Sequence, residues 1–261
     1  MKHITSAANA LYRNLLKLSE SSRERRKQRL TLIDGVHLLD AYLRHGGKLR
    51  EVIVVESATE RPEIAALTRR LAAPPVSLAD RLFDELTELR NRSGILAAIQ
   101  IPAQRTESAH GLWLLLEDIQ DPGNLGSILR TAEAAGVSDV WLSKGCADAW
   151  SPKVLRAAMG AHFGIGIHER SDLVKAALRR SGRVVAMLAG APRSIYDIDL
   201  TGALSIALGN EGAGLSTALL EAATEHGAIP MRGHAESLNV AAAAAISLFE
   251  CVRQLKANPA Q

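Results

Sequence analysis

The run Leu204-Ser-Ile-Ala-Leu208 leads directly into the turn Gly209-Asn-Glu-Gly-Ala-Gly-Leu-Ser216. The first part is predicted to be a strand, and the three glycines after it let the backbone approach a ligand closely or take a positive φ. The turn is not a Walker A loop, because no Gly-Lys-Ser/Thr follows, and its glycine spacing does not match the dinucleotide order Gly-x-Gly-x-x-Gly. Alone it is a weak signal, since Glu211 also fits a solvated turn residue.

Strands and helices alternate on both sides of this stretch. Strands are predicted over Leu112–Ile119, Asp139–Leu142, Gly164–His168, Arg183–Leu188, Leu204–Leu208 and Gly227–Met231. Helices fit between them, and one of these opens with Ser151 as N-cap and Pro152 at the first helical position. The alternation predicts a parallel α/β sheet covered by helices on both faces. Because ligands of such sheets bind at the carboxyl ends of the strands, chemistry is expected in the loops there.

A second loop follows the first of these strands and reads Asp121-Pro-Gly-Asn-Leu-Gly-Ser-Ile-Leu-Arg130. Asp-Pro-Gly-Asn is turn chemistry that leads into a helix. Helical side chains lean back over the preceding turn, so Arg130 is expected over the small residues Gly126 and Ser127, with its guanidinium near the loop. From this pattern alone, a surface arginine paired with Glu133 is the simpler interpretation.

A third segment runs from Ile229-Pro-Met231 into a final helix. Ser237 is predicted as the N-cap of that helix. Between Leu238 and Phe249 the helix is apolar nearly all round, so it is expected to be buried on every side. Contact with a second subunit is the simplest way to bury the outer face of this helix. A central position of the helix within one domain is the alternative.

The first hundred residues predict a small α/β unit. Helices fit Ser6–Ser19, Gly35–Arg44, Pro62–Leu71 and Asp80–Leu89, and strands fit Glu51–Glu56 and Gly94–Ile101. The polar stretch Pro102–His110 has no periodicity and is interpreted as a linker. The sequence thus predicts two domains, residues 1–104 and residues 110–261.

The charge and the aromatic content of the chain indicate which kinds of binding partner and contact are possible. The formal net charge of +3 permits a polyanionic partner, whereas aromatic residues at 3% are too few for base-stacking RNA modules. Any RNA contact should therefore run through Arg and Lys to phosphates. The candidate surface is the basic run Arg23, Arg25, Arg26, Lys27 and Arg29, together with Arg90 and Arg92, and a solvated charged helix explains the run equally well.

Several classes of protein are not favoured. Cys146 and Cys251 are too few for a disulfide framework or a cysteine-based metal site, and the eight histidines show no ligand spacing, so no metal is expected. No apolar run approaches the roughly 20 residues that span a bilayer, and the first residues lack a secretory pattern. A cytoplasmic protein without membrane contact is expected.

Taken together, the three segments resemble the signature motifs of the SpoU/TrmH family of RNA ribose methyltransferases. Its Asn-x-Gly-x-x-x-Arg-Thr motif is met by Asn124, Gly126, Arg130 and Thr131, and Gly-Asn-Glu-Gly-x-Gly is met by residues 209–214. Ile-Pro-Met and Ser-Leu-Asn-Val are met by residues 229–231 and 237–240. The first half is similar, more loosely, to the small substrate-binding domain of many members, although Asp34 stands where relatives more often carry Glu.

The resemblance implies a function and a fold. The chain would transfer a methyl group from S-adenosylmethionine to a ribose 2′-hydroxyl of ribosomal or transfer RNA. The catalytic half would be a SPOUT domain with a C-terminal trefoil knot, and the protein would be a homodimer. Positions that match cofactor contacts are Gly209, Ile229, Met231 and Leu238.

The same resemblance assigns the other site residues. Arg130 would lie beside the target ribose, with Glu211 and Asn239 orienting the site and Asn124 shaping the first loop. Ser237 would cap the helix or touch the substrate, which leaves two roles open. Because an arginine stays protonated, Arg130 is expected to stabilise a developing alkoxide rather than act as the base.

Two other functions compete with this one. A nucleotide-binding oxidoreductase would need a dinucleotide fingerprint and an acidic residue after the next strand, and the sequence has neither. A non-catalytic RNA-binding protein would keep the basic first half but would not need Arg130, Glu211 and Asn239 at these positions.

Overall fold

The parallel sheet predicted for the second half is present in the computed structural model, which describes residues 1–71, 73–87, 93–109 and 111–257. Its strands follow the order β11-β9-β10-β6-β7-β8, and every neighbouring pair is parallel. The strands are β6 (Leu112–Leu116), β7 (Val137–Leu142), β8 (Gly166–His168), β9 (Arg183–Met187), β10 (Leu204–Leu208) and β11 (Glu225–Gly227). Strand β10 is buried along its whole length, as expected for a central parallel strand.

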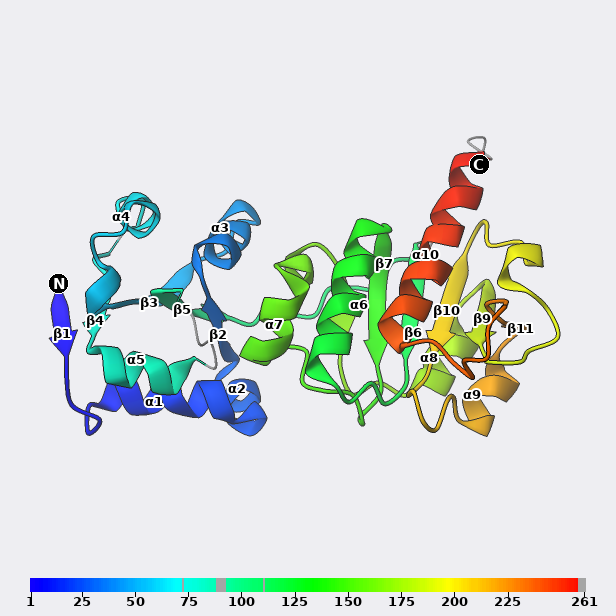
Figure 1. Cartoon of the computed structure of the whole chain (residues 1–261), viewed down its shortest axis with the longest axis horizontal. Helices are drawn as coiled ribbons and strands as arrows, with labels where there is room; N and C mark the ends of the chain where they lie inside the picture. The colour runs from blue at the N-terminus through cyan, green and yellow to red at the C-terminus, as the bar shows by residue number, and fades with distance from the viewer. Residues whose placement is uncertain (72, 88–92, 110, 258–261) are drawn as a thin grey trace. The chain divides into compact units, whose positions relative to one another are not determined.

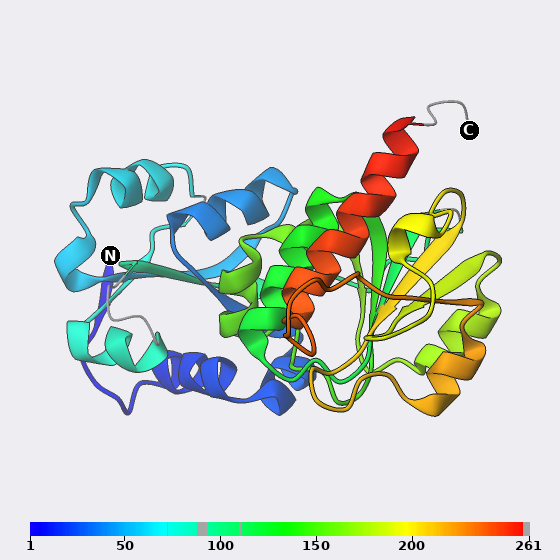
Figure 2. The same cartoon turned by 45° about the vertical axis from the view of Figure 1, so that its right-hand side comes forward.

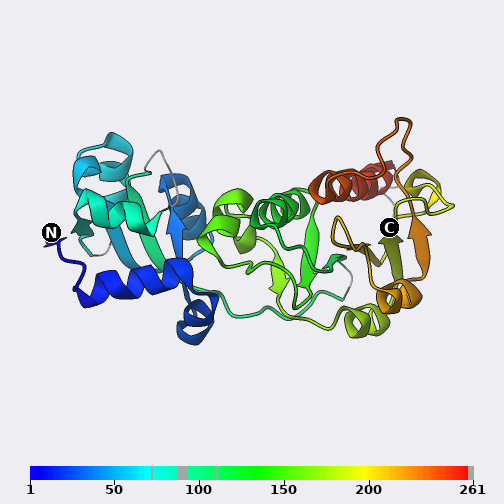
Figure 3. The ribbon, with the colours of Figure 1, turned by 60° about the horizontal axis from the view of Figure 1, so that its bottom comes forward.

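Helices cover both faces of this sheet (Figures 1 and 3). On one face α6 (Pro122–Ala134) packs against α10 (Val240–Ala257), and on the other α8 (Leu173–Arg179) packs against α9 (Thr217–Ala222). An apolar core that includes Trp113, Trp141 and Val184 fills the space beneath α8 and α9. The predicted α/β architecture of the second half is thereby confirmed.

The last predicted strand, Gly227–Met231, is misplaced. Strand β11 ends at Gly227, which pairs with the last residue of β9. Beyond that point the Ala228 amide donates to the Arg193 carbonyl at 2.9 Å, so the chain leaves the sheet for a neighbouring loop. Pro230 has no N–H with which to continue a ladder. The apolar residues around Pro230 therefore lie outside the sheet.

The last helix begins later than predicted, and its N-cap is Asn239 rather than Ser237. The Asn239 Oδ1 atom accepts hydrogen bonds from the amides of Ala241 at 2.9 Å and Ala242 at 3.4 Å. Asn and Ser serve equally well as N-caps, so composition alone did not distinguish the two positions. Figure 2 shows the segment before α10 running back from the edge strand β11 to the start of the helix.

The first unit is built on a five-stranded mixed sheet of order β1-β4-β3-β5-β2. Its strands are β1 (Lys2–Ile4), β2 (Leu30–Asp34), β3 (Leu49–Val55), β4 (Val76–Leu78) and β5 (Ile95–Gln100). Helices α1 (Ala10–Glu20) and α5 (Asp80–Leu86) lie on one face, with α3 (Val36–Arg44) and α4 (Pro62–Thr68) on the other (Figure 1). Sequence patterns missed β1, β2 and β4. Helix α2 (Ser22–Gln28) is the charged helix that was the other interpretation of the basic run. The predicted end of the Asp80–Leu89 helix lies outside the described residues.

The two units are not the continuous halves expected from the sequence. One comprises Met1–Ala103 with Trp150–Phe163, and the other comprises Gln104–Ala149 with Gly164–Gln261. The segment Trp150–Phe163, which the sequence placed in the second domain, contains α7 (Pro152–Ala158). As predicted, Ser151 is the N-cap of this helix, and its side chain accepts a hydrogen bond from the Val154 amide at 3.3 Å. The Trp150 carbonyl accepts a hydrogen bond from the Thr31 hydroxyl of β2 at 2.5 Å. The pattern of α7 predicts a helix but not the sheet on which it packs.

Part of the predicted linker is fixed to the second unit by hydrogen bonds to a buried pair of side chains, Asp139 and His168. His168 Nε2 lies 2.8 Å from Asp139 Oδ1, and both side chains are 3% exposed. The Ser108 amide donates to Asp139 Oδ2 at 3.0 Å, and Gln104 Nε2 lies 2.7 Å from His168 Nδ1. Burial alone raises the pKa of Asp139, but hydrogen bonds from His168, Ser108 and Ser138 outweigh it and hold the pKa below its ordinary value. The charged carboxylate is thus stabilised in the folded state.

Replacing Asp139 with Asn should destabilise the second unit by about 3 kcal/mol near neutral pH, because it leaves the partners of a buried charge unsatisfied. A depressed folded pKa gives stabilisation that is present above the unfolded value and lost as pH falls through the folded value. The deficit of Asp139→Asn should therefore shrink as the pH falls below about 4. Urea denaturation of the wild type and the variant near neutral pH and below about pH 4 measures the difference in unfolding free energy. Glu221→Gln, at an exposed position, is the control. A deficit of equal size at both pH values would refute the assignment.

Candidate active site

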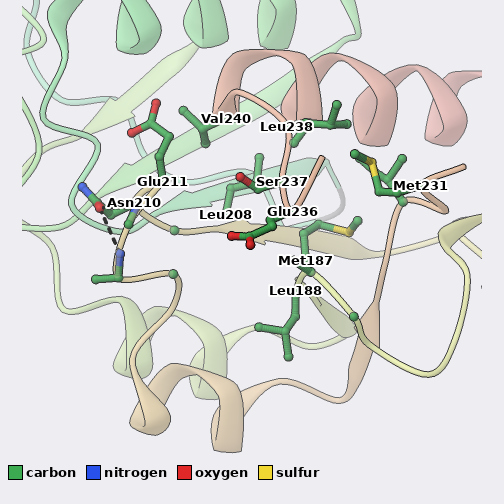
Figure 4. Close-up of a pocket in the computed structure, with 18 residues that line it drawn as sticks. Met187, Leu188, Leu208, Asn210, Glu211, Met231, Glu236, Ser237, Leu238 and Val240 are labelled. Carbon is green, nitrogen blue, oxygen red and sulfur yellow. Dashed lines mark hydrogen bonds between the residues drawn. The ribbon is translucent and has the colours of Figure 1, made fainter. Parts of the chain in front are cut away.

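A pocket of about 310 Å³ opens at the carboxyl ends of β9 and β10 (Figure 4). Three chain segments line it: residues 187–190 from the end of β9, residues 208–214 from the end of β10, and residues 229–243, which run from beyond β11 into the first turn of α10. This is the edge at which a parallel sheet binds its ligands. The volume lies at the lower end of the roughly 300–1,000 Å³ typical of small-molecule sites.

Six residues predicted from the sequence meet in this pocket. They are Gly209, Glu211, Ile229, Met231, Ser237 and Leu238. Leu208, Val240 and Met187 add apolar side chains to the same wall (Figure 4). The pocket therefore combines an apolar lining with a glycine-rich backbone and a small number of polar groups.

The turn after β10 requires glycine at position 209. A Cβ atom built there would lie 2.2 Å from the Gly214 carbonyl oxygen and 2.6 Å from the Leu215 nitrogen. The turn closes on itself, because the Gly214 amide donates to the Asn210 carbonyl at 2.9 Å. Asn210 Oδ1 also accepts from the Gly212 amide at 2.8 Å. The backbone that faces the pocket is consequently held in one compact conformation.

The Glu117 side chain and the Asp118 carbonyl, which directly follow β6, anchor this turn, and the sequence patterns did not indicate them. Glu117 accepts hydrogen bonds from the Ser216 amide at 2.7 Å and from the Ser216 hydroxyl at 2.8 Å. Asn210 Nδ2 donates to the Asp118 carbonyl at 3.1 Å. The available signal was the acidic pair that closes the predicted strand Leu112–Ile119.

A hydrogen-bonded chain joins three of the predicted catalytic residues, one from each sequence segment. Asn239 Nδ2 donates to Asn124 Oδ1 at 3.0 Å, and Asn124 Nδ2 donates to Glu211 Oε1 at 2.5 Å. The Asn124 backbone is itself fixed, since its amide donates to Asp121 Oδ1 at 2.7 Å. The side-chain amide of Asn124 therefore accepts one hydrogen bond and donates another. It fixes the orientation of the Glu211 carboxylate at the pocket.

Arg130 does not line the pocket. It is exposed on α6 and, in the described part of the chain, makes no hydrogen bond or ion pair. The expected surface pairing with Glu133 is thus absent. Among the described residues its guanidinium has no partner, so it is available to bind an anionic ligand.

The basic run divides into structural and exposed residues. Arg25 is 4% exposed and donates to the carbonyls of Leu18 at 2.7 Å and Ser19 at 3.0 Å, so its predicted RNA contact is wrong. Its guanidinium satisfies carbonyls at the end of α1 that have no partner within the helix. Arg23, Arg26 and Arg29 are exposed in the first unit. Arg90 and Arg92, part of the same prediction, lie outside the described residues.

The remaining sequence features lie away from this pocket. Cys251 is buried, and burial raises the pKa of its thiol to about 12, while Cys146 is half-buried. Among the described residues, no three His, Cys, Asp or Glu side chains gather as metal ligands. The helices described are too short or too polar for any of them to cross a membrane.

A family model and several proteins match the chain. The model of the SpoU rRNA Methylase family matches residues 111–249, the range that contains all three segments of the site. The chain is 35% identical over 255 residues to the 23S rRNA (guanosine(2553)-2'-O)-methyltransferase RlmP of Bacillus subtilis, covering 95% of this chain and 98% of that protein. It is 31% identical to the 23S rRNA (guanosine-2'-O-)-methyltransferase RlmB of Vibrio cholerae, covering 87% and 98%.

A solved structure is similar over both units. The SpoU methyltransferase AviRb from Streptomyces viridochromogenes, in complex with the cofactor AdoMet, matches with a TM-score of 0.85 and 27% sequence identity. The match covers 94% of this chain and 98% of that chain. The likeness therefore extends well beyond the segments that form the pocket.

Replacing Gly209 with Ala should lower the free energy of unfolding of the second unit by about 1–3 kcal/mol, because the new methyl group collides with backbone atoms that cannot move aside. Gly233→Ala is the matched control, since a Cβ atom there meets nothing within 4 Å. Denaturant unfolding of both variants measures the difference. Equal stability of the two would show that the turn is not held as described.

Proposed function

Because the chain belongs to the SpoU rRNA methylase family, we propose that it transfers a methyl group from S-adenosylmethionine to a ribose 2′-hydroxyl of ribosomal RNA. The observation that carries the proposal is the hydrogen-bonded chain from Asn239 through Asn124 to Glu211 at the edge of the pocket. Relatives that match along almost the whole chain are named as 23S ribosomal RNA (guanosine-2'-O-)-methyltransferases, which favours ribosomal over transfer RNA.

The residues of the pocket fit S-adenosylmethionine. Leu208, Ile229 and Leu238 provide apolar walls suited to an adenine ring, and the absence of a side chain at Gly209 lets backbone groups approach a ligand closely. Met231 lines the outer part of the same pocket and is 40% exposed. When bound, S-adenosylmethionine supplies a methyl group already activated on a positively charged sulfur.

The protein's own part in the reaction is alignment and charge stabilisation. Glu211, held by Asn124, and Asn239 would orient the ribose so that its 2′-oxygen attacks in line, which can supply much of the rate. Arg130 would stabilise the negative charge that develops on that oxygen, because a guanidinium stays protonated and cannot act as the base. Ser237 is exposed at the pocket and no longer needed as a helix cap, so we assign it to substrate contact.

The site is proposed to be completed by a second copy of the chain. The inner face of α10 is buried, but Phe249 on its outer face is 49% exposed and Ile246 and Val252 beside it are only half-buried. Pairing with the same face of a partner would cover this surface in an isologous dimer. Arg130 on the neighbouring helix α6 would then lie near the interface, within reach of an active site shared by two protomers.

The first unit is proposed to bind the RNA. Its exposed cations Arg23, Arg26 and Arg29 suit phosphate contacts, which position an RNA without reading its sequence. The chain between β11 and α10 is proposed to complete a trefoil knot, and the enzyme to act in the cytoplasm.

Incubation with labelled S-adenosylmethionine and under-modified ribosomal RNA should place label in a 2′-O-methyl nucleoside, with far less label in transfer RNA. Arg130→Ala should lower the single-turnover rate about a hundredfold, the usual scale for losing a group that stabilises transition-state charge. Its cofactor affinity should be unchanged, because Arg130 does not line the pocket. Lys175→Ala, which removes an exposed cation from α8 on the opposite face of the sheet, is the control.

Absence of transfer to either RNA, together with no binding of the cofactor, would contradict the proposed enzyme. If the protein bound RNA but neither transferred methyl groups nor bound the cofactor, the result would support a non-catalytic RNA-binding protein.

Phe249→Glu should convert the dimer into a monomer, because a charge buried without a partner in an apolar interface costs several kcal/mol. Light scattering during size-exclusion chromatography measures the mass of the particle. Leu178→Glu is the matched control, since Leu178 is an exposed apolar residue of α8 on the opposite face of the sheet. A wild-type monomer, or equal loss of dimer in both variants, would contradict this interface.

A further inference from the structure

The charged side chains that line the pocket, among the described residues, are all negative. Of the described residues that line it, two are glutamates, Glu211 and Glu236, and none is Lys, Arg or His. The other polar side chains in its wall, Asn210 and Ser237, are uncharged. The lining therefore presents negative charge to a ligand and favours one that carries positive charge.

The two glutamates are held in different ways. Glu211 accepts the hydrogen bond from Asn124, and Figure 4 shows its carboxylate turned away from Glu236. Glu236 lies in the exposed segment before α10 and, among the described residues, forms no hydrogen bond or ion pair. In the close-up its carboxylate lies in the pocket near Leu208 and Met187. Among the described residues, no contact that stabilises the fold explains why a carboxylate stands at position 236.

On the basis of the proposed function, we infer that Glu236 makes the pocket prefer the reactive cofactor over its own product. The 2′-oxygen forms a bond to the methyl carbon, the carbon–sulfur bond breaks with its electron pair remaining on sulfur, and the hydroxyl proton passes to solvent water. The sulfonium thereby becomes a neutral thioether, while the adenosine and amino-acid parts stay the same. A carboxylate in the wall of the pocket attracts the additional positive charge of the first form, which the second form lacks.

The size of this preference follows from the exposure of Glu236. A carboxylate several ångströms from a cation at a protein surface gains a modest attraction, because solvent and salt screen it. Exposed ion pairs measured in proteins correspond to about a fivefold change in an equilibrium constant. The preference for S-adenosylmethionine over S-adenosylhomocysteine should fall by that factor when the charge is removed. Loss of this preference would also strengthen product inhibition.

Isothermal titration of the full-length protein with each of the two compounds separately tests this. Glu236→Gln should weaken S-adenosylmethionine binding about fivefold and leave S-adenosylhomocysteine binding unchanged. Glu236→Asp, which keeps the charge, should restore most of the preference. Glu221→Gln removes the same charge from the exposed face of α9, outside the pocket, and should change neither affinity.

Added salt gives a second measurement. It should weaken wild-type binding of S-adenosylmethionine more than that of S-adenosylhomocysteine, and this difference should disappear in Glu236→Gln.

Equal weakening of both compounds in Glu236→Gln would overturn the inference, because Glu236 would then contact the ammonium group that the two share. Unchanged binding of both would overturn it as well. If the wild-type protein bound neither compound, the proposed function itself would fail, and the inference with it.

Discussion

One side-chain amide, that of Asn124, connects the three segments on which the site depends. It accepts from Asn239 and donates to Glu211, so the first turn of α6, the turn after β10 and the start of α10 are joined by two hydrogen bonds. Because Asn239 also caps α10, the position of that helix and the orientation of Glu211 are coupled. The pocket is shaped by this connection and by the close approach of Gly209 to Gly214.

Local sequence patterns succeeded where one physical requirement dominates. The strand Leu204–Leu208 was predicted to the residue, because a strand buried on both faces must be apolar and the glycines after it end it sharply. Position 239 shows the limit of this approach. Ser237 and Asn239 are equally good N-caps, and the choice depends on where α10 can pack against α6, which no local pattern contains. The helix that opens at Ser151 was likewise predicted, but it was assigned to the second domain, whereas residues 150–163 belong to the first unit.

Charged residues were the least predictable part of the site. Arg25 and Arg26 are neighbours in a basic run, yet one is buried against helix carbonyls and the other is exposed. Glu211 was expected in the site from the resemblance of its turn to the family motif, whereas Glu236 carries no motif and is recognised only because the fold places it in the pocket. Side-chain charge gives the chemistry available to a residue, and tertiary structure decides whether that chemistry is used for stability or for a ligand.

A double-mutant cycle between Asn124→Ala and Glu211→Ala, measured by single-turnover methyl transfer, tests the role of the Asn124 connection most directly. If Asn124 acts by orienting Glu211, the double variant should be no slower than the slower single variant. The two effects would then fail to add by about 1–3 kcal/mol, the coupling expected for residues in contact. Additive effects would contradict the coupling and would show that the two side chains serve the reaction independently.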